Sequence, residues 1–498
     1  MLRFGTASGR WTIVATVLGS GIAALDGTVV GIALPAIGRQ FHADVSSLQW
    51  VVTGYTLSLA GLLLLGGALG DYYGRRRVFV VGVVWFAAAS LLCGVAPSSG
   101  VLVAARILQG VGGALLTPGS LAILEATFVP EDRSRAIGAW SGFGGVASAI
   151  GPFLGGWLIE AVSWRLVFFI NLPLAVAVAA IAVRHVPESR DETASGRLDY
   201  LGAALITLGL TGLTFGLIRA GSAGWTAPAV VGALGGGVAL LGAFLVVESR
   251  SAHPMLPLGL FRSRQFTAAN AVTFVVYAAL AGGLFLLPVE LQVVAGYSPI
   301  ASGAALLPVT FIMLALSARS GALATRIGPR LQMSLGPMVI ATGLVMLTRI
   351  GPTGTYLAAV LPGVVVYGLG LAINVAPLTS TVLAAAPAEH AGIASAVNND
   401  VARTAGLIAV AVLPVAAGIT GAAYLDPARL DHGFTTALLI AAALCVAGGL
   451  LAAAAIRNPA KARRPGVLVP TGSHCALDGP PLRGPTSVPP PAADATAT

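Results

Sequence analysis

Long apolar runs alternate with short polar segments along almost the whole chain. A helix that crosses a bilayer needs about 20 mostly apolar residues, and it must satisfy its backbone hydrogen bonds within the segment because lipid cannot. The pattern therefore predicts an all-α integral membrane protein with fourteen transmembrane helices. The fourteen runs are 11–34, 48–70, 78–96, 101–126, 134–159, 166–183, 199–218, 228–247, 266–288, 301–319, 331–349, 355–384, 391–418 and 434–456.

The composition agrees with a membrane protein. The 498 residues are 56% hydrophobic and 9% charged, whereas soluble domains carry about 25% charged residues. A net charge of +9 could suggest a nucleic-acid partner. The basic residues are scattered between the runs and form no single basic face, so we expect no nucleic acid among the partners.

The basic residues also predict an orientation. If the N-terminus is inside, 21 of the 28 Lys and Arg residues lie in inner segments, five lie in outer loops, and Arg106 and Arg403 lie within runs. Cytoplasmic loops are enriched in such residues. We therefore expect a multi-pass protein of the cell membrane with both termini in the cytoplasm, and we interpret the first run as a span and not as a cleaved signal peptide.

Patterns typical of enzymes are missing from the sequence. There is no GxxxxGK[ST] loop and no Ser/His/Asp constellation. Cys93, Cys445 and Cys475 have neither metal-ligand spacing nor the pattern of a disulfide framework. We expect no enzymatic activity, no cofactor and no bound metal.

An internal repeat divides the chain into halves. The stretch 67–76 (GALGDYYGRR) has a counterpart at 321–330 (GALATRIGPR), 254 residues further on, and each follows an apolar run at its inner end. Two extra runs between the halves account for this long offset. Duplicated bundles around a central site are a recurring transporter plan. The predicted parts are a six-helix bundle (1–184), linker segments with two inserted helices (185–264), a second six-helix bundle (265–457) and a disordered cytoplasmic tail (458–498).

Several motifs resemble the major facilitator superfamily, and in particular its fourteen-span drug:proton antiporter family. The stretch GALGDYYGRRRVF resembles the signature loop between the second and third spans. The other matches cover roughly residues 10–456 and are LDGTVVGIALP (25–35), LVAARILQGVGGA (102–114), AIGPFLGGWL (149–158), SWRLVFFINLP (163–173), HPMLPLGLFRSRQF (253–266) and LQVVAGYSPIASG (291–303). The resemblance implies the major-facilitator fold and export of drugs in exchange for protons.

Two of these motifs are candidates for gating. Asp71 lies near the C-terminus of a helix, where a negative charge is unfavourable unless an Arg or another helix N-terminus faces it. The resemblance implies that Asp71, Gly74 and Arg75 form a clasp that closes the cytoplasmic side in one state. Simple positive-inside anchoring would explain the Arg residues but neither the acid nor the repeat. Gly151 and Pro152 belong to a fifth-span motif that, in the family, marks antiporters and limits leak through the outer side.

Charged residues within spans are expensive and are therefore functional candidates. Asp26 lies in the outer half of the first span, where desolvation favours a neutral carboxyl. It could then gain a proton from outside and release it inside. The resemblance implies that Arg106 faces the cavity and couples protonation to substrate release. Two alternatives stay open: Asp26 bonded only to a neighbouring hydroxyl, and Arg106 as an anchor to lipid at the outer end.

Five polar residues of the second half are candidates for the substrate cavity. Glu290 could bind a cationic substrate or a second proton, or it could be a solvated carboxylate at the outer rim. Asp400 and Arg403 are three residues apart on one helical face, which favours an ion pair between them over a role in gating. Asn374 and Asn398 complete the set.

The function most consistent with these features is export of small amphipathic compounds by alternating access, driven by protons. Its predicted partners are protons, the small-molecule substrate and membrane lipids, and we expect a monomer. The alternatives are an importer of nutrients or metabolites on the same scaffold and a membrane sensor or scaffold that transports nothing. The sequence does not identify the substrate.

Overall fold

The fold is helical throughout the part of the chain that the structure describes. The structure is a computed structural model, and it describes residues 2–191, 198–251, 254–387, 391–421, 423 and 426–458. The first helices are α1 (Ala7–Phe41), α2 (Val45–Tyr73), α3 (Arg75–Gly94), α4 (Ser99–Thr127), α5 (Pro130–Ala161), α6 (Leu166–Phe169) and α7 (Asn171–His185). They are followed by α8 (Tyr200–Ala223), α9 (Pro228–Arg250) and the 3-10 helix η1 (Leu258–Arg262). The last group comprises α10 (Arg264–Val293), α11 (Pro299–Ala304), α12 (Leu307–Ile327), α13 (Pro329–Leu347), the π-helix η2 (Tyr356–Val360), α14 (Leu361–Ala384), α15 (Ala391–Ala416) and α16 (Pro427–Ala455).

Thirteen helical segments of the described residues are long and apolar enough to cross a membrane. Each of them overlaps one of the fourteen predicted runs. The remaining run, 134–159, lies in α5, which has 32 residues. The multi-pass helical fold is therefore confirmed, and fourteen traverses are compatible with it.

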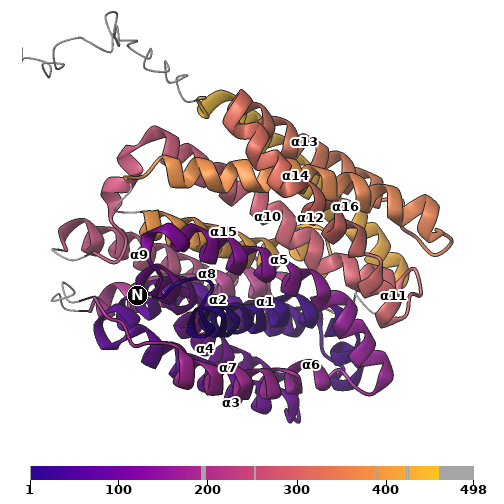
Figure 1. The fold of residues 1–498 in the computed structure, drawn as a ribbon. Coiled ribbons are helices and arrows are strands. Elements are labelled where there is room, and N and C mark those ends of the chain that lie inside the picture. The colour runs from indigo at the N-terminus through magenta and orange to yellow at the C-terminus, as the bar shows by residue number, and fades with distance from the viewer. Residues whose placement is uncertain are drawn as a thin grey trace, which may run out of the picture. The chain divides into compact units, whose positions relative to one another are not determined.

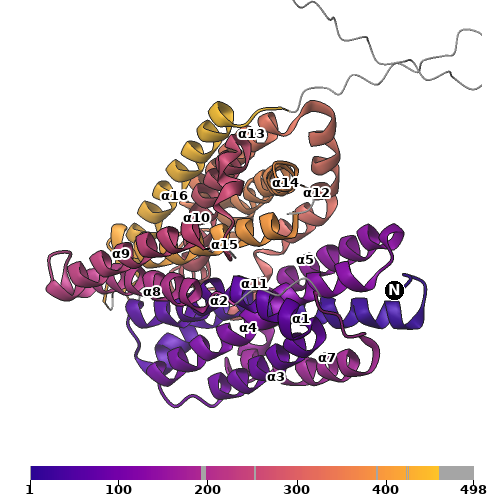
Figure 2. The same ribbon diagram turned by 90° about the vertical axis from the view of Figure 1, so that its left-hand side faces the viewer.

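The helices pack in two groups with an inserted pair beside them (Figure 1). In the first group α4 lies against α2 and α3, and α1 lies against α5 and α7. In the second group α13 lies against α14 and α16, and α10 lies against α15 and α16. Helices α8 and α9 pack on each other, and α8 also contacts both α2 and α15, so the inserted pair lies beside both groups (Figure 2).

The division into separate domains stays a prediction. The contacts join the described residues up to Asn458 into one compact unit. We call helices α1–α7 the N-bundle and helices α10–α16 the C-bundle. The predicted disordered tail falls, from residue 459 on, outside the described residues. We call the end of the bundles that holds Ala7 and Ala455 the inner end, after the orientation that the sequence predicts, and the opposite end the outer end.

The predicted repeat corresponds to a repeated backbone geometry at the inner end. Gly74 joins α2 to α3 with φ +109°, and Gly328 joins α12 to α13 with φ +86°. Both values lie where glycine is strongly favoured because it has no Cβ. The two halves therefore use the same turn at the same place.

The same turn is capped in both halves by a residue that follows the last helix of the bundle. Glu188 lies three residues beyond the end of α7, and its Oε1 accepts a hydrogen bond from the backbone N–H of Arg76 at 3.0 Å. Asn458 lies three residues beyond the end of α16, and its Oδ1 accepts one from the N–H of Arg330 at 3.0 Å. Each cap satisfies an N–H at the start of a helix, where no partner within the helix exists.

Candidate functional site

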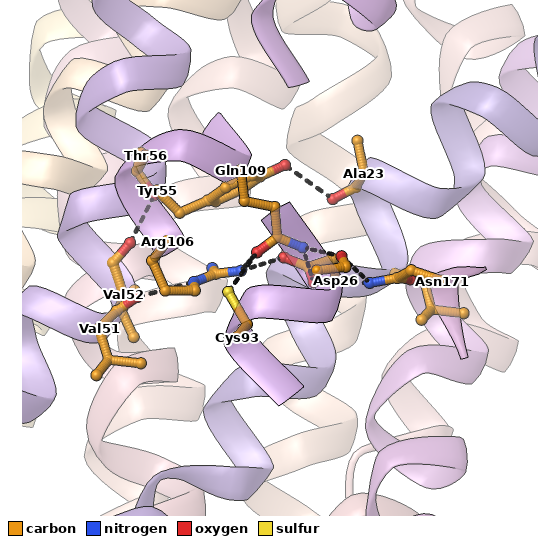
Figure 3. A network of polar contacts seen from close by, with 12 residues as sticks. Ala23, Asp26, Val51, Val52, Tyr55, Thr56, Cys93, Arg106, Gln109 and Asn171 are labelled. Carbon is orange, nitrogen blue, oxygen red and sulfur yellow. Dashed lines mark hydrogen bonds and ion pairs between the residues drawn. The ribbon is translucent and has the colours of Figure 1, made fainter. Parts of the chain in front are cut away.

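A buried ion pair lies within the N-bundle (Figure 3). Asp26 of α1 is 0% exposed and Arg106 of α4 is 1% exposed. Nη1 of Arg106 donates to Oδ2 of Asp26. Two charges are thus held together out of contact with solvent.

Two side-chain amides complete the surroundings of the carboxylate. Nε2 of Gln109, from α4, donates to Oδ1 of Asp26 at 2.8 Å, and Nδ2 of Asn171, from α7, donates to the same oxygen at 3.1 Å. Both amides also donate to Oγ of Ser90 on α3, at 2.6 and 3.1 Å. The Asp26 network therefore ties α1, α3, α4 and α7 together through charge-assisted hydrogen bonds.

Arg106 is fixed by further contacts with α2 and α4. Its Nε donates to the carbonyl oxygen of Val51 at 3.0 Å, and its Nη1 donates to Oε1 of Gln109 at 2.6 Å. Its Cζ lies 4.4 Å from the centre of the Tyr55 ring, a cation–π contact. The hydroxyl of Tyr55 in turn donates to the carbonyl of Ala23 on α1 at 3.3 Å. The guanidinium is thus oriented toward Asp26 by a planar arrangement that a Lys could not reproduce.

This network can respond to a single proton. A proton on Asp26 removes one charge of the pair and leaves Arg106 buried without its counter-ion, a state that is strongly unfavourable in a protein interior. The neighbouring helices would have to rearrange to solvate or pair the guanidinium again. Proton binding at Asp26 would in this way act on the packing of the N-bundle, and such coupling stays a prediction.

The loop between α2 and α3 contains an ion pair of its own. Nη2 of Arg75 lies 2.7 Å from Oδ1 of Asp71, four residues earlier. The Arg75 N–H donates to the carbonyl of Ser189 at 2.8 Å, and the Asp191 N–H donates to the carbonyl of Asp71 at 3.1 Å. The acid at the helix end thus has the Arg partner that its charge requires, and the segment after α7 runs across the loop. These contacts lie within the N-bundle, so the role of Asp71, Gly74 and Arg75 as a clasp stays a prediction.

Glycines of α5 allow close contacts at the outer end. A Cβ added to Gly151 would lie 2.2 Å from Oγ1 of Thr28 on α1. A Cβ on Gly156 would lie 2.3 Å from the carbonyl oxygen of Pro299 on α11, and one on Gly303 of α11 would lie 2.1 Å from the carbonyl oxygen of Pro152. The motif that contains Gly151 and Pro152 therefore packs against both bundles with no room for a side chain.

The two bundles are hydrogen-bonded to each other at the same end. Nε2 of Gln49 on α2 donates to the carbonyl of Val410 on α15 at 2.7 Å, and Nε2 of Gln292 on α10 donates to the carbonyl of Ile32 on α1 at 3.0 Å. We call the contacts of α5 with α11, α2 with α15 and α1 with α10 the outer seam. The structure is thus held closed at its outer end.

The five candidates of the C-bundle do not form one cluster. Nδ2 of Asn398 donates to Oδ1 of Asn270 at 3.0 Å and to Oγ1 of Thr273 at 2.8 Å, both on α10. Asn374 is 0% exposed, and its amide has no hydrogen-bond partner among the described residues. Glu290 is also 0% exposed, and it lies in the last turn of α10.

The predicted ion pair between Asp400 and Arg403 of α15 stays a prediction. Neither carboxylate oxygen of Asp400 has a hydrogen-bond partner in the part of the chain that the structure describes, and the same holds for the Nε of Arg403. Spacing along a helix places two side chains on one face, but the neighbouring helices decide where each of them points. Arg403 lies near enough to act electrostatically on Asp400 and also on Tyr55 of α2, on the other side of the seam.

The comparison with protein families agrees with the fold and with these motifs. A model of the Major Facilitator Superfamily matches residues 16–411. The chain belongs to this superfamily.

Curated relatives in the superfamily are resistance and export proteins. The chain is 36% identical to the tetracenomycin C resistance and export protein of Streptomyces glaucescens over 81% of its own length and 75% of the relative's. It is 36% identical to the puromycin resistance protein of Streptomyces alboniger, over 89% of this chain and 90% of that one. A crystal structure of the peptide transporter POT superposes with a TM-score of 0.63 at 16% identity, covers 91% of this chain and 94% of the other, and supports the fold alone.

Within this superfamily member, the structure answers two questions that the sequence left open. Asp26 is bonded to a guanidinium and two amides and not only to a hydroxyl. Arg106 is too buried to be an anchor to lipid. The proton-coupling role of the two residues stays a prediction, whereas their contact is observed.

The sequence interpretation missed three residues of the Asp26 network. Gln109 follows Arg106 by three residues, so the two share one face of α4, and this spacing could have identified it. Asn171 lies in the motif 163–173 that already carried the resemblance. Ser90 left no signal, since a single Ser in an apolar helix is common.

Proposed function

We propose that this chain exports small amphipathic compounds in exchange for protons by alternating access. The buried pair of Asp26 and Arg106, enclosed by amide donors, is the observation that carries the proposal. The curated relatives, named for antibiotic resistance and export, support the direction of transport. The chain is then a multi-pass transporter of the cell membrane with both termini in the cytoplasm, acts as a monomer and has no enzymatic activity.

The proton acts on the pair in the following way. When the outer seam opens, Asp26 becomes accessible and takes up a proton, and Arg106 loses its counter-ion. The inward-open state returns the proton to the cytoplasm and restores the pair. Separating a buried pair costs about 3–5 kcal/mol. One pH unit supplies about 1.4 kcal/mol and 100 mV about 2.3 kcal/mol for each charge moved, so the gradient across an energised membrane is of the required size.

The substrate would lie between the bundles, next to this pair. The ring of Tyr55 stacks on the guanidinium of Arg106, and Arg403 of the C-bundle acts electrostatically on the same tyrosine from across the seam. Asp400, which lies one helical turn from Arg403, has unpartnered oxygens that could receive a cationic group. A substrate with an apolar body and one polar or cationic group would match these surroundings.

Everted membrane vesicles test the proposal. In vesicles with a preformed pH gradient, puromycin or tetracenomycin C should dissipate the gradient if it is a substrate, and Asp26→Asn should abolish this response. Glu131→Gln is the matched control, because it removes an exposed carboxylate from the first turn of α5. An importer would not release protons in this direction, and a scaffold would give no response with any of a panel of amphipathic compounds. Normal export by the Asp26→Asn variant would refute the mechanism.

A further inference from the structure

A second acid, Glu290, is buried in the C-bundle without a partner. It lies in the last turn of α10, is 0% exposed, and neither of its carboxyl oxygens has a hydrogen-bond partner among the described residues. Its neighbours along the helix, Val289 and Leu291, are buried as well. The solvated outer-rim carboxylate that the sequence left open is therefore ruled out for this state.

Among the residues that the structure describes, the groups around Glu290 offer no compensating cation. Asp431, in the first helical turns of α16, is the titratable group of the described residues that acts on it, and α10 and α16 are packed together. Arg429 and His432 on the same turn are exposed, and so is Arg39 at the outer end of α1. The side-chain Nε2 of Gln292, two residues away on α10, already donates to the carbonyl oxygen of Ile32. The carboxyl therefore faces a second acid and no base.

An ionised carboxylate in such a position would be strongly disfavoured. Burial without a partner favours the neutral form, and a like charge nearby favours it further, because two adjacent carboxylates cannot both ionise easily. A proton on Glu290 removes both penalties. The site thus needs a proton for as long as the outer end stays closed over it.

We infer that Glu290 and Asp431 form a proton-binding site, filled from the outer side, whose occupation allows the outer seam to close. The inference rests on the proposed alternating-access cycle. Gln292 lies two residues from Glu290 on α10, and its hydrogen bond to the Ile32 carbonyl is part of the outer seam. When the seam opens, water reaches the carboxyl pair and the proton can leave. When Glu290 is protonated, the seam can close without burying the charge of this carboxylate. This proton stays at the outer end, in contrast to the one at Asp26.

Spin labels across the outer end test this inference without any substrate. Val162 of the N-bundle and Leu357 of the C-bundle are each 72% exposed at that end. Cysteines at these two positions, in the full chain in nanodiscs with Cys475→Ser, allow the distance to be measured by double electron–electron resonance between pH 5 and pH 9. We expect the wild-type chain to shift from a closed to an open outer end as the pH rises.

Two substitutions separate the inference from its rivals. Glu290→Gln mimics the protonated form and should keep the outer end closed over the whole pH range. Asp431→Asn removes the like charge next to Glu290, so Glu290 gives up its proton more readily. The outer end should still open as the pH rises, but with a midpoint at lower pH than in the wild-type chain. Asp426→Asn, which replaces an exposed acid at the same end, is the matched control and should behave like wild type, because Asn can also cap the start of α16.

The outcomes are decisive in either direction. Loss of pH dependence in Glu290→Gln and its retention in Asp426→Asn and Asp26→Asn support the site. A wild-type response in Glu290→Gln, loss of the response in Asp26→Asn alone, or a wild-type chain that does not respond to pH would overturn it. Because no substrate is added, failure of the proposed export function would leave this measurement interpretable.

Discussion

The glycine of α5 that faces α11 provides the sharpest test of the outer seam. A Cβ on Gly156 would lie 2.3 Å from the carbonyl oxygen of Pro299 and 2.7 Å from Cα of Ile300. Both are backbone atoms, so the clash cannot be relieved by a rotamer change. Gly156→Ala should therefore push α5 and α11 apart and destabilise the closed outer end. In the outward-open state the two helices separate and the clash disappears.

The magnitude follows from the size of the overlap. Overpacking by one methyl group typically costs about 1–3 kcal/mol, which corresponds to a change of about 5-fold to 150-fold in an equilibrium constant. We expect the ratio of closed to open outer ends to fall by a factor in this range. The distance between labels at positions 162 and 357 measures this ratio directly.

The same helix contains a matched control. Gly142 has nothing within 4 Å of its added Cβ. Replacement of Gly by Ala also changes helix propensity by about 1 kcal/mol, and this effect is common to both variants. If Gly156→Ala and Gly142→Ala show the same closed fraction, the close approach of α5 to α11 does not control closure and the account of the seam is wrong.

Two further substitutions address the N-bundle. Arg106→Lys keeps the charge but loses the bond to the Val51 carbonyl and the flat stacking on Tyr55, so export should fall at least 10-fold at unchanged protein level; export near the wild-type rate would show that charge alone suffices. Gly74→Ala places a Cβ 2.7 Å from Oε1 of Glu188 at a φ of +109°, so it should lower the thermal unfolding midpoint of the purified protein. Gly70→Ala, whose added Cβ has its nearest contact at 3.9 Å, should leave the midpoint unchanged. Equal midpoints for the two variants would contradict the strained turn.

The sequence predicted correctly those features that follow from the hydrocarbon core of the bilayer. Apolar runs must be helical in lipid, so the positions of the spans could be predicted without knowledge of their contacts. Asp26 and Arg106 were identifiable for the same reason, because charges stand out in such runs. The neutral residues that complete their network, Gln109, Asn171 and Ser90, do not stand out, and only the packing of four helices shows that they meet.

Local rules alone do not settle the surroundings of the charged residues in the C-bundle. The spacing of Asp400 and Arg403 predicts an ion pair on α15, and this stays a prediction, because the Asp400 oxygens have no hydrogen-bond partner among the described residues whereas Arg403 acts electrostatically on both Asp400 and Tyr55. Glu290 is close to the end of its span, a position that would be exposed to solvent in an isolated helix. In the bundle, packing of α10 with α16 and α1 buries it completely.

By itself, the sequence determined the membrane-spanning helices, the repeat of the two halves and the membership of the charged pair, because each depends on the cost of polar groups in lipid or on a local pattern. Tertiary structure alone decided which partners these groups have, which end of the bundles is closed, and that Glu290 faces Asp431 and, in the described part of the chain, no cation. Those features arise from contacts between residues far apart in the chain, and no local pattern encodes the distance between them.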